Sequence, residues 1–282
     1  MVKRRKPDWL LPAHKSKFMD SRAARPLRIL AEYLDPMVRL RDANIADTIV
    51  IFGSARIHPR EDAARLLQQA RRNVRGRMTP EKRQRLHATQ RLMEMSRFYE
   101  EARQLSRRIT EWSRTLGENP RRFVVCSGGG PGIMEAANRG AAEAGGTTLG
   151  LNIELPHEQE PNRYIPRELC INFHYFFMRK LWFAQLAKAL VVFPGGFGTM
   201  DELWEMLTLA QTGKLSRNTL ILIYGRRYWD DLVNWRAMLR WGVISEKDFE
   251  LLQFADNVED AFQRVKLYME EHHMKLDGDW LE

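Results

Sequence analysis

The segment Pro194–Glu202, with the sequence PGGFGTMDE, combines residues that could bind an anion with residues that could do acid–base chemistry. It follows the apolar run Ala189–Phe193, which predicts a buried strand. From Thr199 onward the apolar residues recur at helical spacing. A glycine turn between a strand and a helix offers free backbone N–H groups at the positive end of the helix dipole. The turn therefore predicts an anion site with the Glu202 carboxylate close by.

A second interpretation gives Thr199 and Glu202 a purely structural role. Their Thr-x-x-Glu spacing matches a capping box, in which the glutamate accepts a hydrogen bond from the threonine N–H. Spacing alone leaves both interpretations open. They differ in whether Glu202 is free to act on a ligand.

Two further glycine-containing loops follow predicted strands. The strand Thr48–Phe52 ends in Gly53-Ser54-Ala55-Arg56, and the strand Arg122–Ser127 ends in Gly128-Gly129-Gly130-Pro131-Gly132. In a Rossmann-type sheet such loops line one crevice, and glycine lets a ligand lie close to the backbone. Neither loop has the spacing of a Walker or dinucleotide motif. The alternative for Ser54 is a helix cap.

Two cations, Arg179 and Lys180, stand inside the otherwise aromatic run FFMRKLWF, which begins at Phe176. Burying a cation in such a run is costly unless the cation faces a cleft or an anion. The alternative is that Arg179 reaches the surface across aromatic faces.

Alternating strands and helices predict an α/β fold, a Rossmann-like, doubly wound parallel sheet with helices on both faces. Residues 1–46 predict a basic N-terminal extension, and residues 47–282 predict the Rossmann-like domain. Residues 60–115 predict a helical insertion of two long helices that break near Gly76–Pro80. The other predicted elements are helix Ile133–Ala144, strand Thr147–Ile153, strand Glu168–Tyr175, helix Phe176–Lys188, strand Thr219–Tyr224, helix Tyr228–Trp241 and helix Val258–His272.

The net charge of +9 is unevenly distributed along the chain. Residues 1–46 contain 11 Lys and Arg against 5 Asp and Glu, and residues 56–121 contain 17 against 8. The rest is acidic, with 17 against 23. A basic surface outside the α/β core indicates a polyanionic effector or a nucleic acid as partner. The alternative is a solvated or oligomer-facing helical layer.

Cysteine content and hydropathy limit the class of protein. Cys126 and Cys170 are the only cysteines, and both lie in predicted strands as reduced core residues. No apolar run approaches the ~20 residues of a membrane span, and the basic N-terminus lacks the apolar stretch of a secretory signal. We therefore expect a cytoplasmic protein without a membrane partner. His272 and His273 have no third ligand in view, so we expect no metal site.

Several segments, in this order, resemble the LOG ("lonely guy") family, many of whose members were mislabelled as lysine decarboxylases. They are Gly53–Arg56, Ser127–Glu135, Arg179-Lys180 and Pro194–Glu202, the last of which matches the family signature P-G-G-x-G-T-x-x-E. The resemblance covers residues 47–58 and 119–270. It implies a Rossmann-like fold and hydrolysis of the N-glycosidic bond of nucleoside 5′-monophosphates to a free base and ribose 5-phosphate. It also implies a homodimer or a multiple of dimers, with no metal and no cofactor.

The resemblance assigns roles to individual residues. Glu202 and Arg179 would be catalytic, because an ionised carboxylate opposes the positive charge that builds on the ribose and can activate water. Phe177 stands where plant members carry a histidine, so we expect AMP or a broader nucleotide range rather than cytokinin nucleotides. The 5′-phosphate would bind Gly195, Gly196, Gly198 and Thr199, and the rest of the nucleotide would bind Gly53, Ser54, Gly129, Gly130, Met178 and Lys180.

Three functions other than hydrolysis are alternatives: lysine decarboxylation, nucleotide sensing and nucleic-acid binding. Lysine decarboxylation requires a lysine that forms a Schiff base with pyridoxal phosphate, and Lys180 and Lys188 sit in no such motif. A non-catalytic nucleotide sensor would use the same loops, but the presence of Glu202 and Arg179 favours hydrolysis. A single-stranded nucleic-acid-binding protein would use the basic segments, which contain few aromatic residues and no recognised nucleic-acid motif.

Overall fold

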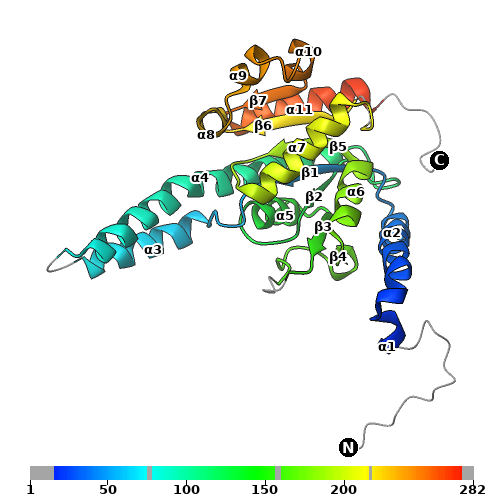
Figure 1. Cartoon of the computed structure of the whole chain (residues 1–282), viewed down its shortest axis with the longest axis horizontal. Coiled ribbons are helices and arrows are strands. Elements are labelled where there is room, and N and C mark those ends of the chain that lie inside the picture. Colours follow the sequence, from blue (N-terminus) through cyan, green and yellow to red (C-terminus); the bar gives the residue numbers. More distant parts are fainter. Residues whose placement is uncertain (1–15, 75–77, 156–159, 216–217, 275–282) are drawn as a thin grey trace, which may run out of the picture.

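A seven-stranded parallel sheet forms the centre of the molecule, with the strand order β4-β3-β2-β1-β5-β6-β7 (Figure 1). The computed structural model describes residues 16–74, 78–155, 160–215 and 218–274. Residues 1–15 of the predicted N-terminal extension lie outside the described residues, as does Gly76 at the start of the predicted break near Gly76–Pro80. The strands are β1 Thr48–Phe52, β2 Val124–Ser127, β3 Thr148–Ile153, β4 Cys170–Phe173, β5 Ala187–Val192, β6 Leu220–Tyr224 and β7 Leu252–Ala255.

The strand order confirms the predicted doubly wound α/β fold. From β1 the chain runs outward through β2 and β3 to β4, and then returns to β5 on the other side of β1. The order therefore reverses between β1 and β5, where Phe52 pairs with Val192. In an open parallel sheet, ligands bind in the crevice beyond the carboxyl ends of the strands at this switch point.

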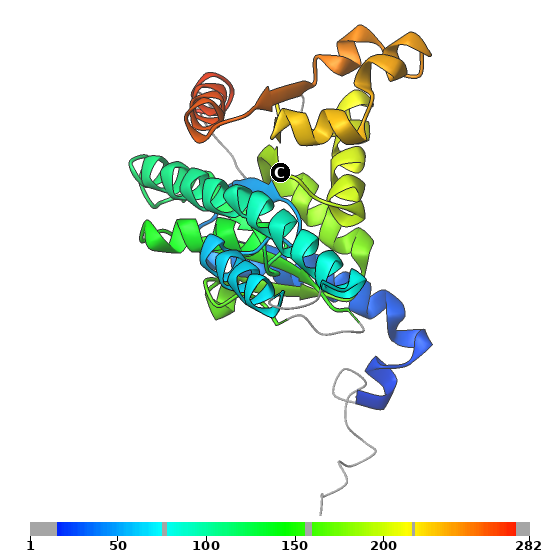
Figure 2. The ribbon, with the colours of Figure 1, turned by 90° about the vertical axis from the view of Figure 1, so that its left-hand side faces the viewer.

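Helices cover both faces of the sheet because the strands are apolar on both sides. In β1, Ile49 and Ile51 face the core under α4, α5 and α11, while Val50 and Phe52 face the core under α6 and α7. Figure 2 separates these two layers, with α4, α5 and α11 on one side and α7 on the other. The helices are α1 Ser16–Met19, α2 Arg25–Asp42, α3 Arg60–Asn73, α4 Pro80–Arg114, α5 Ile133–Glu143, α6 Phe176–Leu186, α7 Phe197–Gln211, α8 Arg226–Leu232, α9 Trp235–Arg240, α10 Glu246–Phe249 and α11 Val258–His272, with short 3-10 turns at Arg22–Ala24 and Arg167–Leu169.

Several predicted element boundaries were wrong for tertiary reasons. Helix α6 ends at Leu186, because Ala187 already pairs with β1 as the first residue of β5. The single helix predicted from residue 228 to 241 is two helices, separated where Val233 is extended and Asn234 caps α9 through the Ala237 N–H. The strand predicted from residue 168 to 175 is shortened to β4 by the 3-10 turn that precedes it.

Helix α4 shows that the predicted insertion has two different parts. Its first half and α3 form a hairpin that projects beyond the sheet (Figure 1). Its second half is core, since Tyr99, Leu105 and Ile109 are fully buried against the sheet and α5. This half is therefore the crossover helix that connects β1 to β2 in the Rossmann-like fold, and not an appendage.

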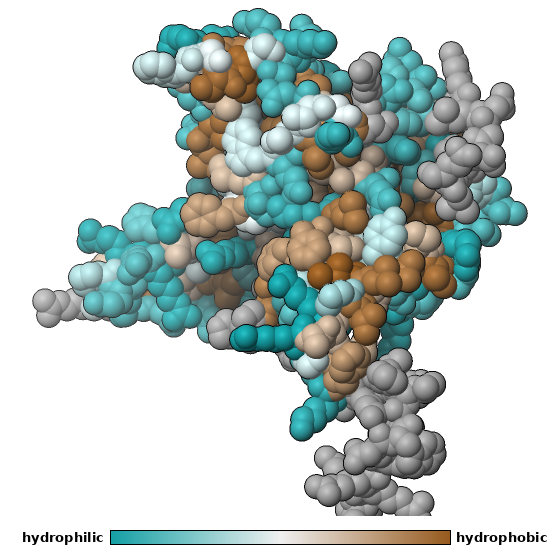
Figure 3. Space-filling model, turned by 45° about the vertical axis from the view of Figure 1, so that its right-hand side comes forward, coloured by the Kyte–Doolittle hydropathy of each residue, from teal (hydrophilic) through white to brown (hydrophobic). Residues whose placement is uncertain are grey.

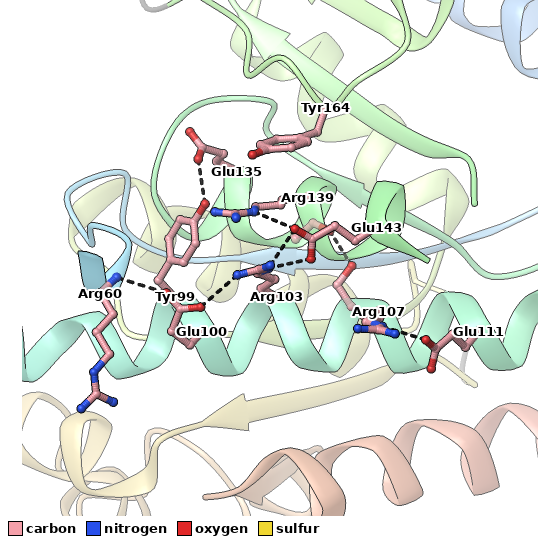
Figure 4. Close-up of polar contacts among 12 residues, drawn as sticks. Arg60, Tyr99, Glu100, Arg103, Arg107, Glu111, Glu135, Arg139, Glu143 and Tyr164 are labelled. Carbon is pink, nitrogen blue, oxygen red and sulfur yellow. Dashed lines mark hydrogen bonds and ion pairs between the residues drawn. The ribbon is translucent and has the colours of Figure 1, made fainter. Parts of the chain in front are cut away.

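A polar network fixes α4 to α5 (Figure 4). The Arg103 guanidinium donates two hydrogen bonds of 2.7 Å to the Glu143 carboxylate and one of 3.3 Å to Glu100. The buried Tyr99 hydroxyl donates to Glu135 at 2.7 Å, and burial raises the pKa of Tyr99, so the phenol remains a donor. Because α5 begins at the second glycine loop, this network ties α4 to the edge of the crevice.

Helix α2 is attached to α6 through an internal proline. Pro36 has no N–H to donate to the Glu32 carbonyl four residues earlier. The Trp182 indole N–H from α6 donates to that carbonyl instead, at 3.1 Å. The Glu32 carboxylate accepts the backbone N–H groups of His174 at 2.9 Å and Tyr175 at 3.2 Å, directly before α6. Glu32, whose carbonyl is left free by Pro36, thus connects α2 to α6, the helix that carries Arg179.

Cys126 is buried in β2, Cys170 is partly buried at the start of β4, and both are free thiols. None of the helices in the described part of the chain has the length and apolarity to cross a membrane. Nor do the described residues include a group of three or more His, Cys, Asp and Glu side chains placed to hold a metal ion.

Truncating Leu105 tests whether the second half of α4 belongs to the core. Leu105→Ala should lower the free energy of unfolding by about 2–5 kcal/mol, because it leaves a cavity at a fully buried site. Leu86→Ala, in the projecting half of the same helix, is the matched control and should cost clearly less. Urea unfolding measures both, and equal losses would contradict the division of α4 into two parts.

Candidate active site

A cavity of about 780 Å³ lies at the switch point of the sheet, beyond the carboxyl ends of β1, β2 and β5. All three glycine loops contribute to its wall. Ten of the residues assigned by resemblance line it: Gly53, Ser54, Gly129, Gly130, Arg179, Gly195, Gly196, Gly198, Thr199 and Glu202. The structure thus brings together segments that are up to 149 positions apart in the sequence.

Ser54 joins the three loops through its backbone. Its N–H donates to the Pro194 carbonyl at 3.0 Å, and its carbonyl accepts the Ile133 N–H at 3.1 Å. Its side-chain oxygen accepts the N–H of Arg56 at 3.1 Å, inside the loop. The prediction that Ser54 caps a helix was wrong, because α3 begins only at Arg60 and its N-cap is Pro59.

The glycines of the loops fall into two groups. A Cβ atom on Gly129 would lie 1.6 Å from Asn152 Oδ1, and one on Gly195 would lie 2.1 Å from Thr199 Oγ1. These positions are glycine because neighbouring atoms occupy the space. A Cβ on Gly196 or Gly198 would meet no described atom within 4 Å. Both line the cavity, so their missing side chains leave room for a ligand.

Helix α7 presents an open N-terminus to the cavity. It begins at Phe197 with Gly196 as N-cap, and no described side chain caps it. The N–H groups of its first turn have no intrahelical acceptor, and they lie at the positive end of the helix dipole. The capping box is therefore wrong: Thr199 already lies inside the helix, and Glu202 follows one turn later. What the turn offers to an anion is backbone N–H groups.

Among the described residues that line the cavity, Glu202 is the only acid. Its Oε1 atom lies 2.5 Å from Nη2 of Arg179, and the two side chains are only 6% and 13% exposed. Burial raises the pKa of Glu202 above the ordinary value of a glutamate, although the nearby Arg179 and Lys180 act in the opposite direction. The site thus holds a buried carboxylate whose pKa is raised by burial and lowered by the two nearby cations.

Arg179 faces the cavity and not the surface. Its guanidinium lies 5.5 Å from the ring centroids of both Phe176 and Phe183, so aromatic faces line its path. Its Nε atom is buried and has no hydrogen-bond partner among the described residues. A buried donor without a partner is costly, and a ligand oxygen in the cavity could accept from it.

Met178 and Lys180 were assigned to the nucleotide but do not line the cavity. Met178 packs in the core between α6 and the sheet. Lys180 pairs with Asp201 at 2.8 Å and with Glu205 at 2.6 Å, on α7. Successive residues on a helix are turned by about 100°, so only Arg179 of these three points into the cavity.

A buried polar network behind the second glycine loop had no signal in the sequence. Asn162 donates to the Gly129 carbonyl at 3.0 Å and to Asn138 Oδ1 at 2.9 Å. Ser127 donates to the same Asn138 oxygen at 2.6 Å and accepts the Gly129 N–H at 3.0 Å. These contacts satisfy the backbone on the inner side of the loop and fix its shape. Asn138 lies in α5 and Asn162 in a distant loop, so spacing could not predict their contact.

Two other residues that the sequence did not single out shape the second and third loops. Asn152, on β3, occupies the space beside Gly129. Tyr228, on α8, donates from its hydroxyl to the Gly195 carbonyl at 2.9 Å. Both line the cavity. Tyr228 thus satisfies a carbonyl oxygen of the glycine turn with a hydrogen bond.

Comparison with known proteins links this site to a family. A family model described as "Possible lysine decarboxylase" matches residues 134–265. The chain is 30% identical over 142 residues to a cytokinin riboside 5′-monophosphate phosphoribohydrolase of Mycobacterium marinum, a match that spans 50% of this chain and 74% of the relative. It is 28% identical over 141 residues to the Mycobacterium tuberculosis protein of the same name, with 50% and 74% covered. Among solved structures, the Moco carrier protein from Chlamydomonas reinhardtii aligns with a TM-score of 0.44 and 20% identity over 80% of this chain and 98% of that chain.

Alanine substitutions separate the two groups of glycines. Gly198→Ala should raise the free energy of unfolding by up to about 1 kcal/mol, because alanine is favoured in a helix and the position is open. Gly195→Ala should lower it by about 1–3 kcal/mol, because the new Cβ would overlap Thr199. Urea unfolding of both variants gives the comparison, and a destabilised Gly198→Ala would show that packing also requires this glycine.

Proposed function

This chain belongs to the LOG family, and from that premise we propose that it hydrolyses nucleoside 5′-monophosphates of the AMP type. The products would be the free base and ribose 5-phosphate. The observation that carries the proposal is the buried Glu202–Arg179 pair, in which Glu202 is the only acid on the described part of the cavity wall, beside an uncapped glycine turn. The matched Mycobacterium marinum relative is named as a phosphoribohydrolase, which supports the same reaction class.

In the proposed mechanism, one end of the cavity binds the 5′-phosphate and the other end carries out the chemistry at C1′ of the ribose. The 5′-phosphate binds the first-turn N–H groups of α7 at Gly196–Thr199, which orients the ribose. The Glu202 carboxylate then lies toward C1′, where it opposes the positive charge that develops as the bond to the base breaks. It also accepts a proton from the attacking water, whose oxygen bonds to C1′, while the leaving base takes up a proton as its bond to C1′ breaks. Arg179 keeps the carboxylate ionised and in place, and its free Nε–H is available to a substrate oxygen.

Apolar side chains on the cavity wall support a purine-sized base. Met134, Ile153, Leu155 and Phe176 all line the cavity. A planar base is favoured in such a pocket, where it is removed from water. The apolar wall supports the AMP type of substrate and leaves the choice among purine bases to experiment.

We also propose that the chain forms a homodimer that covers the cavity mouth. Phe197, which is 93% exposed, lies on the rim together with the exposed Phe176 and Leu232. Phe177 and Leu181 of α6 extend this apolar surface. Figure 3 shows apolar side chains gathered on the part of the surface where α6 and α7 lie in Figure 1. An exposed apolar patch of this kind is typical of a protein interface.

The release of free base from AMP and from adenosine tests the proposed substrate. The kcat/KM for AMP should exceed that for adenosine by about 100-fold or more, because two charge-assisted hydrogen bonds contribute ~1.5–3 kcal/mol each and 1.4 kcal/mol is tenfold. Chromatographic detection of adenine gives both rates. Equal rates would contradict the phosphate site, and AMP binding without release of adenine would identify a sensor.

Replacing Glu202 tests the catalytic role. Glu202→Gln should lower kcat for AMP by about 10²–10⁴, because glutamine carries no negative charge and cannot accept the proton. Its amide oxygen can still accept a hydrogen bond from Arg179, so the fold should persist by circular dichroism. Asp201→Asn is the control on the same helix, since Asp201 is 56% exposed and contacts Lys180 outside the cavity.

The pH profile gives a second measurement of the same role. Because burial raises the pKa of Glu202, the wild-type rate should fall on acidification at a pH above the ordinary value for glutamate. The residual activity of Glu202→Gln should lack this acidic limb. A variant with nearly the wild-type rate and profile would remove Glu202 from the mechanism. Glu135 and Glu205 are not ready substitutes, because they bond with Tyr99 and Lys180 away from the cavity.

A further inference from the structure

A second cavity, of about 410 Å³, adjoins the first on the other side of the glycine turn. The two cavities share five lining residues: Ser54, Arg56, Gly195, Gly196 and Tyr228. The second does not include Thr199, Arg179 or Glu202. It therefore extends beyond the phosphate end of the proposed substrate, away from the carboxylate.

The described wall of the second cavity carries positive charge. Its only charged residues, within the part of the chain that the structure describes, are Arg56 from the first glycine loop and Arg91 from α4. Both are exposed, and neither forms an ion pair with any described residue. Other arginines of α4 do have acidic partners, as Arg107 has Glu111. Two unpaired guanidinium groups on one cavity repel each other and favour an anion that is large enough to contact both.

The segment that forms the outer wall is absent from the family match. Arg91, Leu92 and Met95 come from the part of α4 that precedes the fully buried half. The family match begins at residue 134, so this wall and Arg56 both lie outside it. The second cavity thus combines residues inside the match, such as Gly195 and Gly196, with an arginine-bearing wall that the match does not cover.

The shared residues indicate how a ligand of the first cavity could reach the second. Gly195 and Gly196 belong to both walls, and Arg56 faces both spaces. Gly196 has no described atom within 4 Å of a Cβ position, so the turn itself leaves the passage open. A 5′-phosphate at this turn would place any group bonded to it next to Arg56 and Arg91. A monophosphate would leave the second cavity empty.

We propose that the second cavity binds the β-phosphate of a nucleoside 5′-diphosphate, so that the chain accepts diphosphates as well as monophosphates. This inference rests on the proposed function, because it takes the α-phosphate to lie at the turn before α7. The bond that breaks is the same N-glycosidic bond. Water adds its oxygen to C1′ and a proton goes to the leaving base, so ADP yields adenine and ribose 5-diphosphate. The bond between the two phosphates stays intact.

Kinetics with AMP and ADP on the Arg91→Ala variant test the proposal. Wild-type protein should release adenine from ADP, and Arg91→Ala should lower kcat/KM for ADP by about 3–10-fold, the range for a partly exposed charge-assisted hydrogen bond. The kcat/KM for AMP should stay within about twofold, because a monophosphate does not reach Arg91. Arg85→Ala is the matched control, since Arg85 is an exposed arginine of α4 that lines neither cavity.

Calorimetric titration of the Glu202→Gln variant separates this inference from the proposed function, because binding does not require cleavage. ADP should bind more tightly than AMP, and adding Arg91→Ala should remove the difference. If AMP is not cleaved but ADP binds through Arg91, the proposed function fails and the subsite stands. If AMP is cleaved while ADP neither reacts nor competes with it, the subsite fails alone.

Competition experiments with inorganic phosphate show whether the second cavity binds the β-phosphate of a nucleotide or an independent anion. Under the proposal, free phosphate competes with ADP, and Arg91→Ala does not change how AMP binds. If inorganic phosphate binds together with AMP in an Arg91-dependent manner and ADP gains no affinity, the cavity holds an independent anion. That result would overturn the proposal.

Discussion

Two backbone hydrogen bonds of Ser54 hold the site together. They connect the loop after β1 with the loop after β5, through the Pro194 carbonyl, and with the start of α5, through the Ile133 N–H. The loops can approach this closely because Gly53 and Gly132 have no side chain: a Cβ on Gly53 would lie 2.6 Å from Ile133, and one on Gly132 would lie 2.3 Å from the Ser54 carbonyl oxygen. The shape of the cavity is therefore set by backbone contacts, and helices α6 and α7 add the reactive side chains.

Helices α6 and α7 are joined by two sets of ion pairs that differ in burial. Arg179 and Lys180 are neighbours in sequence and both contact acids on α7, but Arg179–Glu202 is buried at the cavity while Lys180 contacts the more exposed Asp201 and Glu205. A buried ion pair is weak evidence for stability, because desolvation offsets the attraction between the charges. Stability alone therefore does not explain the buried pair, which supports the catalytic role that we propose for it.

Local signals predicted the parts of this structure that depend on local interactions. Apolar β-branched runs followed by glycine located the central strands and all three loops, and β1 and α11 have the predicted bounds. The ion pair of Glu202 could not be predicted in the same way, because its partner Arg179 is 23 residues away in the sequence. Whether Glu202 instead caps the helix with Thr199 depends on where the helix begins, and α7 begins at Phe197. The division of α4 into a projecting half and a buried half could not be predicted for a similar reason. The apolar face of the helix can be recognised in the sequence, but only its contact with α5 shows which half is buried.

The segments before residue 134 are attached to the site and not only to the domain. Helix α2 contacts α6 through the Glu32 carbonyl, which Pro36 leaves free and Trp182 occupies. Helix α4 contacts α5 through Arg103 and Glu143. Since α6 carries Arg179 and α5 begins at a glycine loop, each added helix is fixed to an element that shapes the cavity. Because these contacts join helices before residue 134 to elements that border the cavity, α2 and α4 constrain where Arg179 and the second glycine loop lie.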